Sequence, residues 1–380
     1  MGLFKKIQII IVCFCLVFTS AAQKKYAPPI TWKQSGVLPV QPNGLIHMGL
    51  SGVVSGVVGD QIIIAGGNNF PEGLPWEGGI KKYYKRVIVY NNQKDTLLNT
   101  FTFNLPANVA YAAVAQLKDG IFYAGGENEN SPLSSAYFIK KSKSQSFEII
   151  ELPSLPIAIS NAVAVATENA VYVLGGANKE GVSNKVWKLA LNNIKKGWTA
   201  QASMPQATAF AAAAIANEHI YIMGGRCKEA NGISKIYKEV YAFDVENNFW
   251  EQKASLPETV SAACAVAIDN NKILFIGGDK IVVFHEVEML AAKIAATTDT
   301  TIKKELTVVK NNLQKTHPGF SKDVLAYDAT LNKWSPYAQL NFTAPVTTSA
   351  FLFNHKILLP VGEIKPGIRT PYIWVGSFKK

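Results

Sequence analysis

The sequence predicts an all-β protein built from a unit that repeats about every 50 residues. Apolar runs rich in β-branched and aromatic residues end five times in Gly-Gly, each pair is followed by a second apolar run, and an aromatic residue comes next. The first glycines of these pairs lie 59, 50, 49 and 53 residues apart, at Gly66, Gly125, Gly175, Gly224 and Gly277. Glycine pairs allow tight turns and close approach of backbones, so we interpret them as structural.

Within each unit the strands are predicted in the same order. The strand before the diglycine covers residues 62–65, 121–124, 171–174, 220–223 and 273–276. The next strand covers residues 87–90, 136–139, 186–189, 240–243 and 324–327. Outer-strand aromatics follow at Phe101, Phe147, Trp198, Trp250 and Trp334. Crossings into the next unit are marked by Leu105-Pro106, Leu155-Pro156, Met204-Pro205 and Leu256-Pro257. This pattern resembles the kelch motif, in which each repeat supplies one four-stranded propeller blade.

A sixth unit is less regular. Its counterpart of the diglycine is Val361-Gly362, 84 residues after Gly277, because an insertion at about residues 281–322 has helical spacing of apolar residues. The chain ends after one further strand, but residues 30–34 with Trp32, followed by Leu38-Pro39, match the missing outer strand and crossing. We therefore predict one six-bladed propeller over residues 23–380, with the N-terminal strand completing the last blade and removing open sheet edges.

The first residues resemble a secretory signal peptide. Lys5 and Lys6 precede a short apolar run, and small residues up to Ala22 suit signal peptidase, so residues 1–22 are predicted to be removed. A membrane anchor is the alternative, but the run is short for a bilayer span. The mature protein is then expected in the periplasm or secreted, without a stable membrane anchor.

The composition limits the classes of ligand and partner that can be expected. Removing Lys5 and Lys6 takes the formal charge from +11 to +9, which favours anionic ligands. The lysines are scattered, without the arginine runs of a nucleic-acid surface, so nucleic-acid binding is not predicted. Cys227 and Cys264 do not make a disulfide framework, and the five histidines lack metal-ligand spacing. No cofactor or metal is expected.

Candidate site residues gather where a propeller presents its loops. The positions just past the diglycines are Asn68, Glu127, Ala177, Arg226, Asp279 and Glu363. Mixed charges around a channel mouth suit a small polar ligand, although solvated loop tips have the same composition. The loop of residues 68–86 adds Trp76, which could stack on a sugar, and Glu77, Lys81 and Lys82, which could bond to it. Tyr111, Asn161, Phe210 and Ser261 could line the same mouth or serve only as wall residues.

The segment of residues 362–370, Gly-Glu-Ile-Lys-Pro-Gly-Ile-Arg-Thr, with a helical insertion before it, resembles the signature loop of the bacterial N-acetylneuraminate epimerases. These are sialic acid mutarotases with six kelch blades. Residues 76–84, Trp-Glu-Gly-Gly-Ile-Lys-Lys-Tyr-Tyr, resemble a second loop of that family. The order of the two loops along the chain is similar to that of the cyclically permuted mutarotases, a change that a closed ring tolerates.

The resemblance implies catalytic roles for Glu363 and Arg369. Glu363 would act as general base on the anomeric hydroxyl and later return the proton. Arg369 offers a planar fork that suits the C1 carboxylate of the sugar. Lys365 would either hold Glu363 ionised or add positive charge. A Glu-Arg pair that only pins a surface loop is the alternative interpretation.

Two functions of different kinds follow. The first is a carbohydrate isomerase that interconverts the α and β anomers of free N-acetylneuraminate. The second is a non-catalytic kelch module that binds a glycan or a protein, because this fold often does only that.

Overall fold

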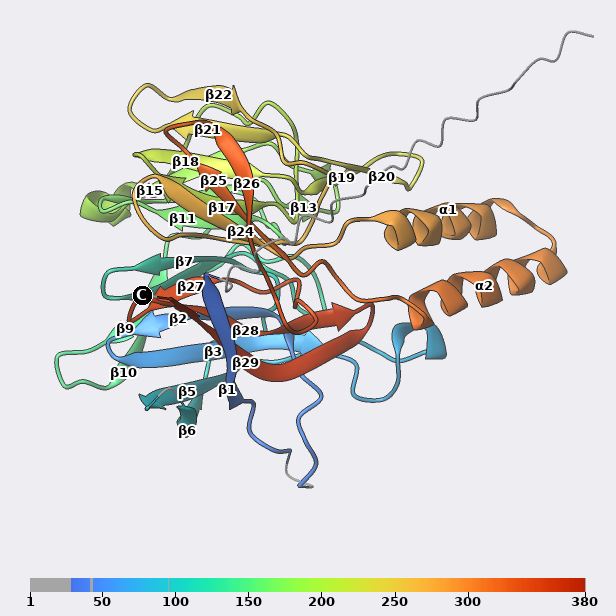
Figure 1. Ribbon diagram of the computed structural model, residues 1–380, viewed down its shortest axis with the longest axis horizontal. Coiled ribbons are helices and arrows are strands. Elements are labelled where there is room, and N and C mark those ends of the chain that lie inside the picture. Colours follow the sequence, from blue (N-terminus) through green and yellow to red (C-terminus); the bar gives the residue numbers. More distant parts are fainter. Residues whose placement is uncertain (1–28, 42–43, 95, 380) are drawn as a thin grey trace, which may run out of the picture.

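A computed structural model of the protein describes residues 29–41, 44–94 and 96–379. Six antiparallel four-stranded sheets, one of them with a fifth short strand, form a six-bladed β-propeller, which confirms the predicted fold class (Figure 1). The predicted signal peptide, residues 1–22, lies outside the described residues.

The first three blades follow one another along the chain. Blade 1 contains β2 (Ser51–Val58), β3 (Gln61–Asn69), β5 (Arg86–Gln93) and β6 (Thr96–Asn104), with β4 (Lys82–Tyr83) paired to β3 and the 3-10 turn η1 (Pro75–Glu77) in its loop. Blade 2 contains β7 (Ala113–Leu117), β8 (Gly120–Ala124), β9 (Ala136–Lys141) and β10 (Phe147–Leu152). Blade 3 contains β11 (Val163–Ala166), β12 (Ala170–Leu174), β15 (Val186–Ala190) and β16 (Trp198–Ala200), with η2 (Leu191–Lys196) before its outer strand.

The second half of the ring adds the two helices. Blade 4 contains β17 (Ala212–Ala216), β18 (His219–Met223), β21 (Val240–Asp244) and β22 (Phe249–Lys253). Blade 5 contains β23 (Cys264–Ala267), β24 (Lys272–Ile276), β25 (Asp323–Asp328) and β26 (Lys333–Gln339). Blade 6 contains β27 (Phe351–Phe353), β28 (Lys356–Lys365), β29 (Ile368–Phe378) and β1 (Ile30–Val37). Two short ribbons, β13 (Ala177–Asn178) with β14 (Gly181–Val182) and β19 (Arg226–Lys228) with β20 (Ser234–Ile236), extend the loops of blades 3 and 4.

The strand before each diglycine is buried on both faces. Every residue of β8 and β12 is buried, because each of these strands lies between two neighbouring blades. This explains why these strands are continuous apolar runs rather than alternating ones. At Gly66 (φ +64°) an added β-carbon would lie 2.4 Å from the Val109 carbonyl oxygen, so the turn after the strand requires glycine.

The outer-strand tryptophans link neighbouring blades. The indole Nε1 of Trp198 donates to the Pro153 carbonyl oxygen at 2.7 Å, and Trp250 and Trp334 donate to Ala202 and Ala254 at 2.9 and 2.8 Å. In each case the acceptor precedes the crossing from the previous blade. These repeated aromatics are therefore structural, as the repeat pattern indicates.

The N-terminal strand completes the ring. β1 pairs with β29 in antiparallel register from Ile30 opposite Phe378 to Val37 opposite Tyr372, and Figure 1 shows it lying across the last blade. Trp32 is buried and packs edge-on against Phe342 with ring centroids 5.8 Å apart. The first described strand thus supplies the edge that the end of the chain lacks.

The insertion forms an antiparallel helical hairpin of α1 (Val282–Ala296) and α2 (Thr300–Lys315). Figure 1 shows it projecting from the side of the propeller that also carries the β19–β20 ribbon and the loop containing η1. Glu288 of α1 accepts bonds from the backbone nitrogen and the hydroxyl of Ser234, at 2.7 and 2.8 Å, which anchors α1 to the ribbon. In the part of the chain that the structure describes, no helix has the length and apolar content to cross a membrane.

Candidate active site at the channel mouth

The six positions past the diglycines are structurally equivalent. Each forms an antiparallel bridge with a residue that leads into the innermost strand of a blade: Asn68 with Ser51, Glu127 with Ala110, Ala177 with Ser160, Arg226 with Ala209, Asp279 with Ser261, and Glu363 with Val346. The repeat therefore brings side chains that are about 50 residues apart in sequence to one ring.

A second ring lies next to the first. The residue after each bridge partner has a positive φ, at Gly52, Tyr111, Asn161, Phe210, Ala262 and Thr347. Their backbones join neighbouring blades: Tyr111 donates to Gly52, Asn161 to Tyr111, Phe210 to Asn161, Ala262 to Phe210, and Gly52 to Thr347, at 2.7 to 3.0 Å. Non-glycine residues rarely adopt this conformation, and these five bonds between neighbouring blades help to offset its cost.

A cavity of about 400 Å³ opens above these rings. Charged residues Lys81, Glu127, Arg226, Asp279 and Glu363 line it together with Tyr111, Asn161 and Phe210 of the second ring. Its other wall comes from the helical insertion and the turn after α2, with Val283, Phe284, Val287, Gln314, His317 and Phe320. A concave site with charged groups of both signs on one side and a mostly apolar wall on the other is suited to a small polar ligand with apolar groups.

Glu363 reaches the cavity from the β28–β29 hairpin, where it lies directly opposite Arg369 in the strand register. Its Oε1 accepts the backbone N–H of Gly367 at 2.9 Å, and its Oε2 lies 3.3 Å from Nη2 of Arg369. The carboxylate side chain is 18% exposed. Held at both oxygens and still open to the cavity, it is placed to accept a proton from a bound ligand.

Arg369 lies behind Glu363 and does not line the cavity. Its side chain is 3% exposed and donates to the Ser51 hydroxyl at 3.1 Å and to Oδ1 of Asn68 at 3.3 Å. The ring of Phe70 covers the guanidinium with 4.7 Å between the Arg369 Cζ and the ring centroid. This geometry holds Glu363 in place, whereas the sequence suggested contact between Arg369 and the sugar.

Arg226 lines the cavity as a cation without an ion-pair partner among the described residues, whereas Lys81 is paired with Glu127. Its guanidinium lies between the rings of Phe210 and Phe284, with Cζ 3.9 and 4.4 Å from their centroids, and Nη1 donates to the Ser261 hydroxyl at 3.5 Å. Among the described residues no carboxylate forms an ion pair with it. Burial lowers the pKa of Arg226, although arginine stays charged near neutral pH. Asp279, Glu288 and Glu363 lie near enough to act in the opposite direction on its pKa. A half-buried guanidinium with both faces covered and no ion-pair partner among the described residues can bind an anion that enters the cavity.

Lys81 and Glu127 form a second polar group on the cavity wall. Nζ of Lys81 lies 3.4 Å from Oε1 of Glu127 and 5.2 Å from the centroid of the Tyr111 ring. The Tyr83 hydroxyl donates to the same Glu127 oxygen at 2.7 Å, and burial together with this bond raises the pKa of Tyr83. The three side chains come from blades 1 and 2 and present both donors and acceptors.

Comparison with known proteins gives the family. A sequence model of the N-acetylneuraminate epimerases matches residues 152–380. The chain belongs to the N-acetylneuraminate epimerase family. It is 27% identical over 231 residues to the N-acetylneuraminate epimerase of Yersinia pestis (strain Pestoides F), a match that covers 60% of this chain and 57% of the relative.

Two further relatives are also named as N-acetylneuraminate epimerases. The N-acetylneuraminate epimerase of Vibrio vulnificus (strain YJ016) is 28% identical over 227 residues, covering 57% of each chain. N-acetylneuraminate epimerase 1 of Escherichia coli O6:H1 (strain CFT073) is 24% identical over 237 residues, covering 60% of this chain and 59% of the relative. The matched region thus spans less than two thirds of the length of these relatives.

Besides Arg369, four further residues that the sequence suggested for the site, Asn68, Trp76, Glu77 and Lys365, lie outside the cavity of this member of the epimerase family. Asn68 is fully buried and bonds to Ser51 and Arg369. Trp76 packs against the Gly367 turn and accepts a bond from Asn311 of α2 at its carbonyl oxygen. Glu77 is exposed and accepts the backbone N–H of Leu74, which caps η1. Lys365 is not among the residues that line the cavity.

The cavity also contains residues that the repeat pattern does not identify as site residues. Phe284 and His317 come from the helical insertion and the turn after it. Tyr83, which follows the two lysines of the blade 1 loop, does not line the cavity itself but donates to Glu127, which does. Nothing in the repeat predicts how an insertion docks. The only signal for His317 is its position at the end of a helical pattern, before Pro318-Gly319.

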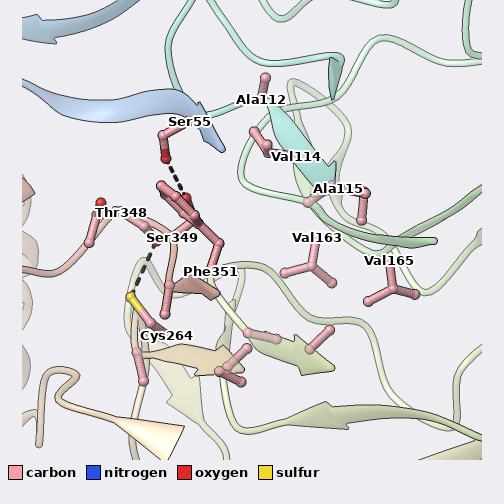
Figure 2. Close-up of a pocket in the computed structure, with 18 of the residues that line it drawn as sticks. Ser55, Ala112, Val114, Ala115, Val163, Val165, Cys264, Thr348, Ser349 and Phe351 are labelled. Carbon is pink, nitrogen blue, oxygen red and sulfur yellow. Dashed lines mark hydrogen bonds between the residues drawn. The ribbon is translucent and has the colours of Figure 1, made fainter. Parts of the chain in front are cut away.

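A second cavity of about 420 Å³ continues along the innermost strands and shares the second ring with the first. Figure 2 shows its small, mostly apolar lining, with Ser55 bonded to Ser349 and the thiol of Cys264 directed at the Thr348 carbonyl oxygen. Burial raises the pKa of Cys264 to about 12. Neither Cys264 nor Cys227 forms a disulfide, and no charged side chain lines this part of the channel.

Proposed function

We propose that the protein is a mutarotase that interconverts the α and β anomers of a free acidic sugar, N-acetylneuraminate. The observation that carries this proposal is that Arg226, a half-buried guanidinium held between two aromatic rings and without an ion-pair partner among the described residues, lines the same cavity as the carboxylate of Glu363. The first suits the carboxylate of the sugar and the second suits a proton transfer. The names of the relatives favour the same substrate.

The reaction needs a base and an anchor. Glu363 takes the proton of the anomeric hydroxyl while the bond from the anomeric carbon to the ring oxygen breaks. The open-chain ketone then rotates, and the ring closes on its other face with the proton steps reversed. A single carboxylate can serve both directions because it is a base in one and an acid in the other.

The anchor in this proposal is Arg226 rather than Arg369. Its planar fork can bind the C1 carboxylate with two parallel hydrogen bonds, and its two aromatic neighbours hold the plane of the fork fixed. Arg369 then acts through Glu363, as the residue that orients the base. Lys81, Tyr83 and Glu127 are available to hydroxyl groups of the sugar on the opposite wall.

The proposed reaction can be followed directly by proton NMR. Adding the protein to freshly released α-N-acetylneuraminate should speed the approach to the anomeric equilibrium. Glu363→Gln should abolish the effect, whereas Glu151→Gln, an exposed carboxylate on β10, should leave it unchanged. Wild-type protein that binds the sugar but does not change the equilibration rate would instead support a non-catalytic glycan-binding module.

The predicted compartment, periplasmic or secreted, remains a proposal that rests on residues 1–22. Sequencing the N-terminus of the protein isolated from its own cells would test it, with Gln23 as the expected first residue.

A further inference from the structure

His317 is a buried imidazole that the helical insertion places in the cavity. It follows α2, is 4% exposed, and packs against the ring of Phe320 with centroids 5.1 Å apart. A β-carbon built on Gly319 would lie 3.5 Å from the Ile364 carbonyl oxygen, so the turn that carries His317 packs on the residue next to Glu363. The imidazole and the proposed base are therefore carried by two segments that pack against each other.

The backbone fixes which nitrogen of His317 carries the proton. Nδ1 accepts the N–H of Gly319 at 3.0 Å, so the proton of the neutral ring is on Nε2. Protonation of Nδ1 would place its N–H against the N–H of Gly319, which is also a donor. Burial lowers the pKa of His317, and nearby Lys365 lowers it further, while Asp279 acts in the opposite direction. The ring is thus neutral near neutral pH, with Nε2–H as a donor.

This donor has no hydrogen-bond partner among the residues that the structure describes. A donor in a mostly buried cavity gains from an acceptor on the ligand, because leaving it unpaired after water is displaced costs free energy. Glu363 accepts a proton from one oxygen of the anomeric centre, and the other oxygen of that centre, in the ring, gains electron density as its bond to carbon breaks. The ring oxygen is therefore the atom that needs a hydrogen-bond donor during the reaction.

We propose that His317 is a further catalytic residue, which donates its Nε2–H to the ring oxygen of the sugar and stabilises the charge that develops there. This inference rests on the proposed mutarotase function. The proton taken by Glu363 from the anomeric hydroxyl is the one that the ring oxygen finally receives, and the electron pair of the broken carbon–oxygen bond goes to that oxygen. His317 keeps its proton, because a neutral imidazole is too weak an acid to release it, so atoms and charge balance in both directions.

Two substitutions test the role of His317. His317→Leu removes the donor and should lower kcat about 100-fold with KM within a factor of about three, as expected for a group that binds mainly the transition state. His317→Gln places an amide N–H near the position of Nε2 and should recover at least a tenth of the wild-type kcat. His355→Asn, on the exposed β27–β28 turn, is the matched control and should have wild-type kinetics.

The measurements separate this proposal from the proposed function. If the wild type does not speed mutarotation, both fail; if the wild type is active and His317→Leu is equally active, only the role of His317 is lost. Nitrogen-15 NMR of the histidine rings gives a readout that does not depend on activity. It should show His317 protonated at Nε2 alone between about pH 6.5 and 8, and a ring protonated at Nδ1 in that range would overturn the proposal.

Discussion

Nη2 of Arg369 lies 3.3 Å from Oε2 of Glu363, in an ion pair that is almost closed to solvent on the arginine side, at 3% exposure, and partly open on the carboxylate side, at 18%. The two residues are direct partners in the β28–β29 register, so the pair is set by the hairpin itself. In the proposed reaction this asymmetry in exposure gives the two residues different tasks: the carboxylate meets the ligand, and the guanidinium holds the carboxylate.

This arrangement predicts how Arg369→Lys will behave. Lysine keeps the charge but loses the fork that reaches Ser51, Asn68 and Glu363 together. We expect kcat to fall at least tenfold with KM for N-acetylneuraminate nearly unchanged, and the free energy of unfolding to fall by about 1–3 kcal/mol. Steady-state kinetics and urea unfolding measure the two effects. A variant with raised KM and normal kcat would show instead that Arg369 binds the sugar.

Arg226 should give the opposite kinetic pattern. Arg226→Gln removes the proposed anion anchor, and KM should rise at least tenfold, which corresponds to about 1.4 kcal/mol. Calorimetric titration with the acidic sugar and with its methyl ester separates the causes. The wild type should prefer the free acid, and the variant should lose that preference. Equal loss of affinity for both ligands would point to a disturbed cavity rather than to a missing anchor.

Phe284 connects the helical insertion to Arg226, the proposed anion anchor. Phe284→Leu keeps an apolar side chain on α1 but removes one of the two rings that cover the Arg226 guanidinium. Because a cation–π contact contributes about 0.5–2 kcal/mol, KM should rise by a factor of about 2 to 30. Phe249→Leu, on the exposed outer strand of blade 4, is the matched control and should leave KM unchanged. An unaffected Phe284 variant would mean that Phe210 alone orients the arginine.

The sequence predicts the ring well because each blade repeats the same local rules. Continuous apolar runs ending in diglycine identify the strands between blades, and the displaced outer strand with Trp32 identifies the closure. The same repeat predicts that Glu127, Arg226 and Glu363 converge. The repeat does not predict whether the polar side chain at this position faces the cavity or is buried inside the protein. Asn68 has the same place in the repeat as Glu363, yet it turns inward because Ser51 and Arg369 offer it partners there.

The position of the helical insertion is the other feature that the sequence does not predict. Spacing of apolar residues predicts its helices, but the docking of α1 depends on contacts such as Glu288 with Ser234, between segments that share no repeat. Phe284 and His317 reach the cavity only through that docking. The repeat therefore predicts the site residues that the blades supply, but not those that the helical insertion supplies.

Closure of the ring by β1 makes a prediction about stability. Gly376 faces Trp32, and a β-carbon added there would lie 2.8 Å from the Trp32 ring. Gly376→Ala should therefore push the indole away from Phe342 and lower the free energy of unfolding by about 1–3 kcal/mol, as overpacking in a core does. Trp32→Ala should cost about 3–5 kcal/mol by leaving a cavity. Urea unfolding checks both, and wild-type stability of either variant would show that β1 contributes little to closure.

The surroundings of His47 and His317 predict that the free energy of unfolding decreases below neutral pH. His47 and His317 each accept at Nδ1 the N–H of the glycine two residues later, at 3.0 Å, and burial lowers the pKa of both, helped by Arg86 near His47 and Lys365 near His317. Since their pKa values in the folded protein lie below the unfolded value of about 6.5, the unfolded state binds more protons as the pH drops through that value. The stabilisation from the neutral rings is therefore fully present above about pH 6.5 and is lost progressively as the pH falls towards the lower folded pKa values.

The corresponding experiment compares urea unfolding at several pH values between about 5 and 8. One histidine can contribute a slope of at most about 1.4 kcal/mol per pH unit, so the wild type should lose stability over the lower half of this range. Changing both His47 and His317 to Gln should flatten the curve there while leaving other titrations in place. His355→Asn, on an exposed turn, should retain the wild-type slope. If the double variant keeps the full slope, other groups cause the acid sensitivity, and the two His-x-Gly turns do not hold their rings neutral.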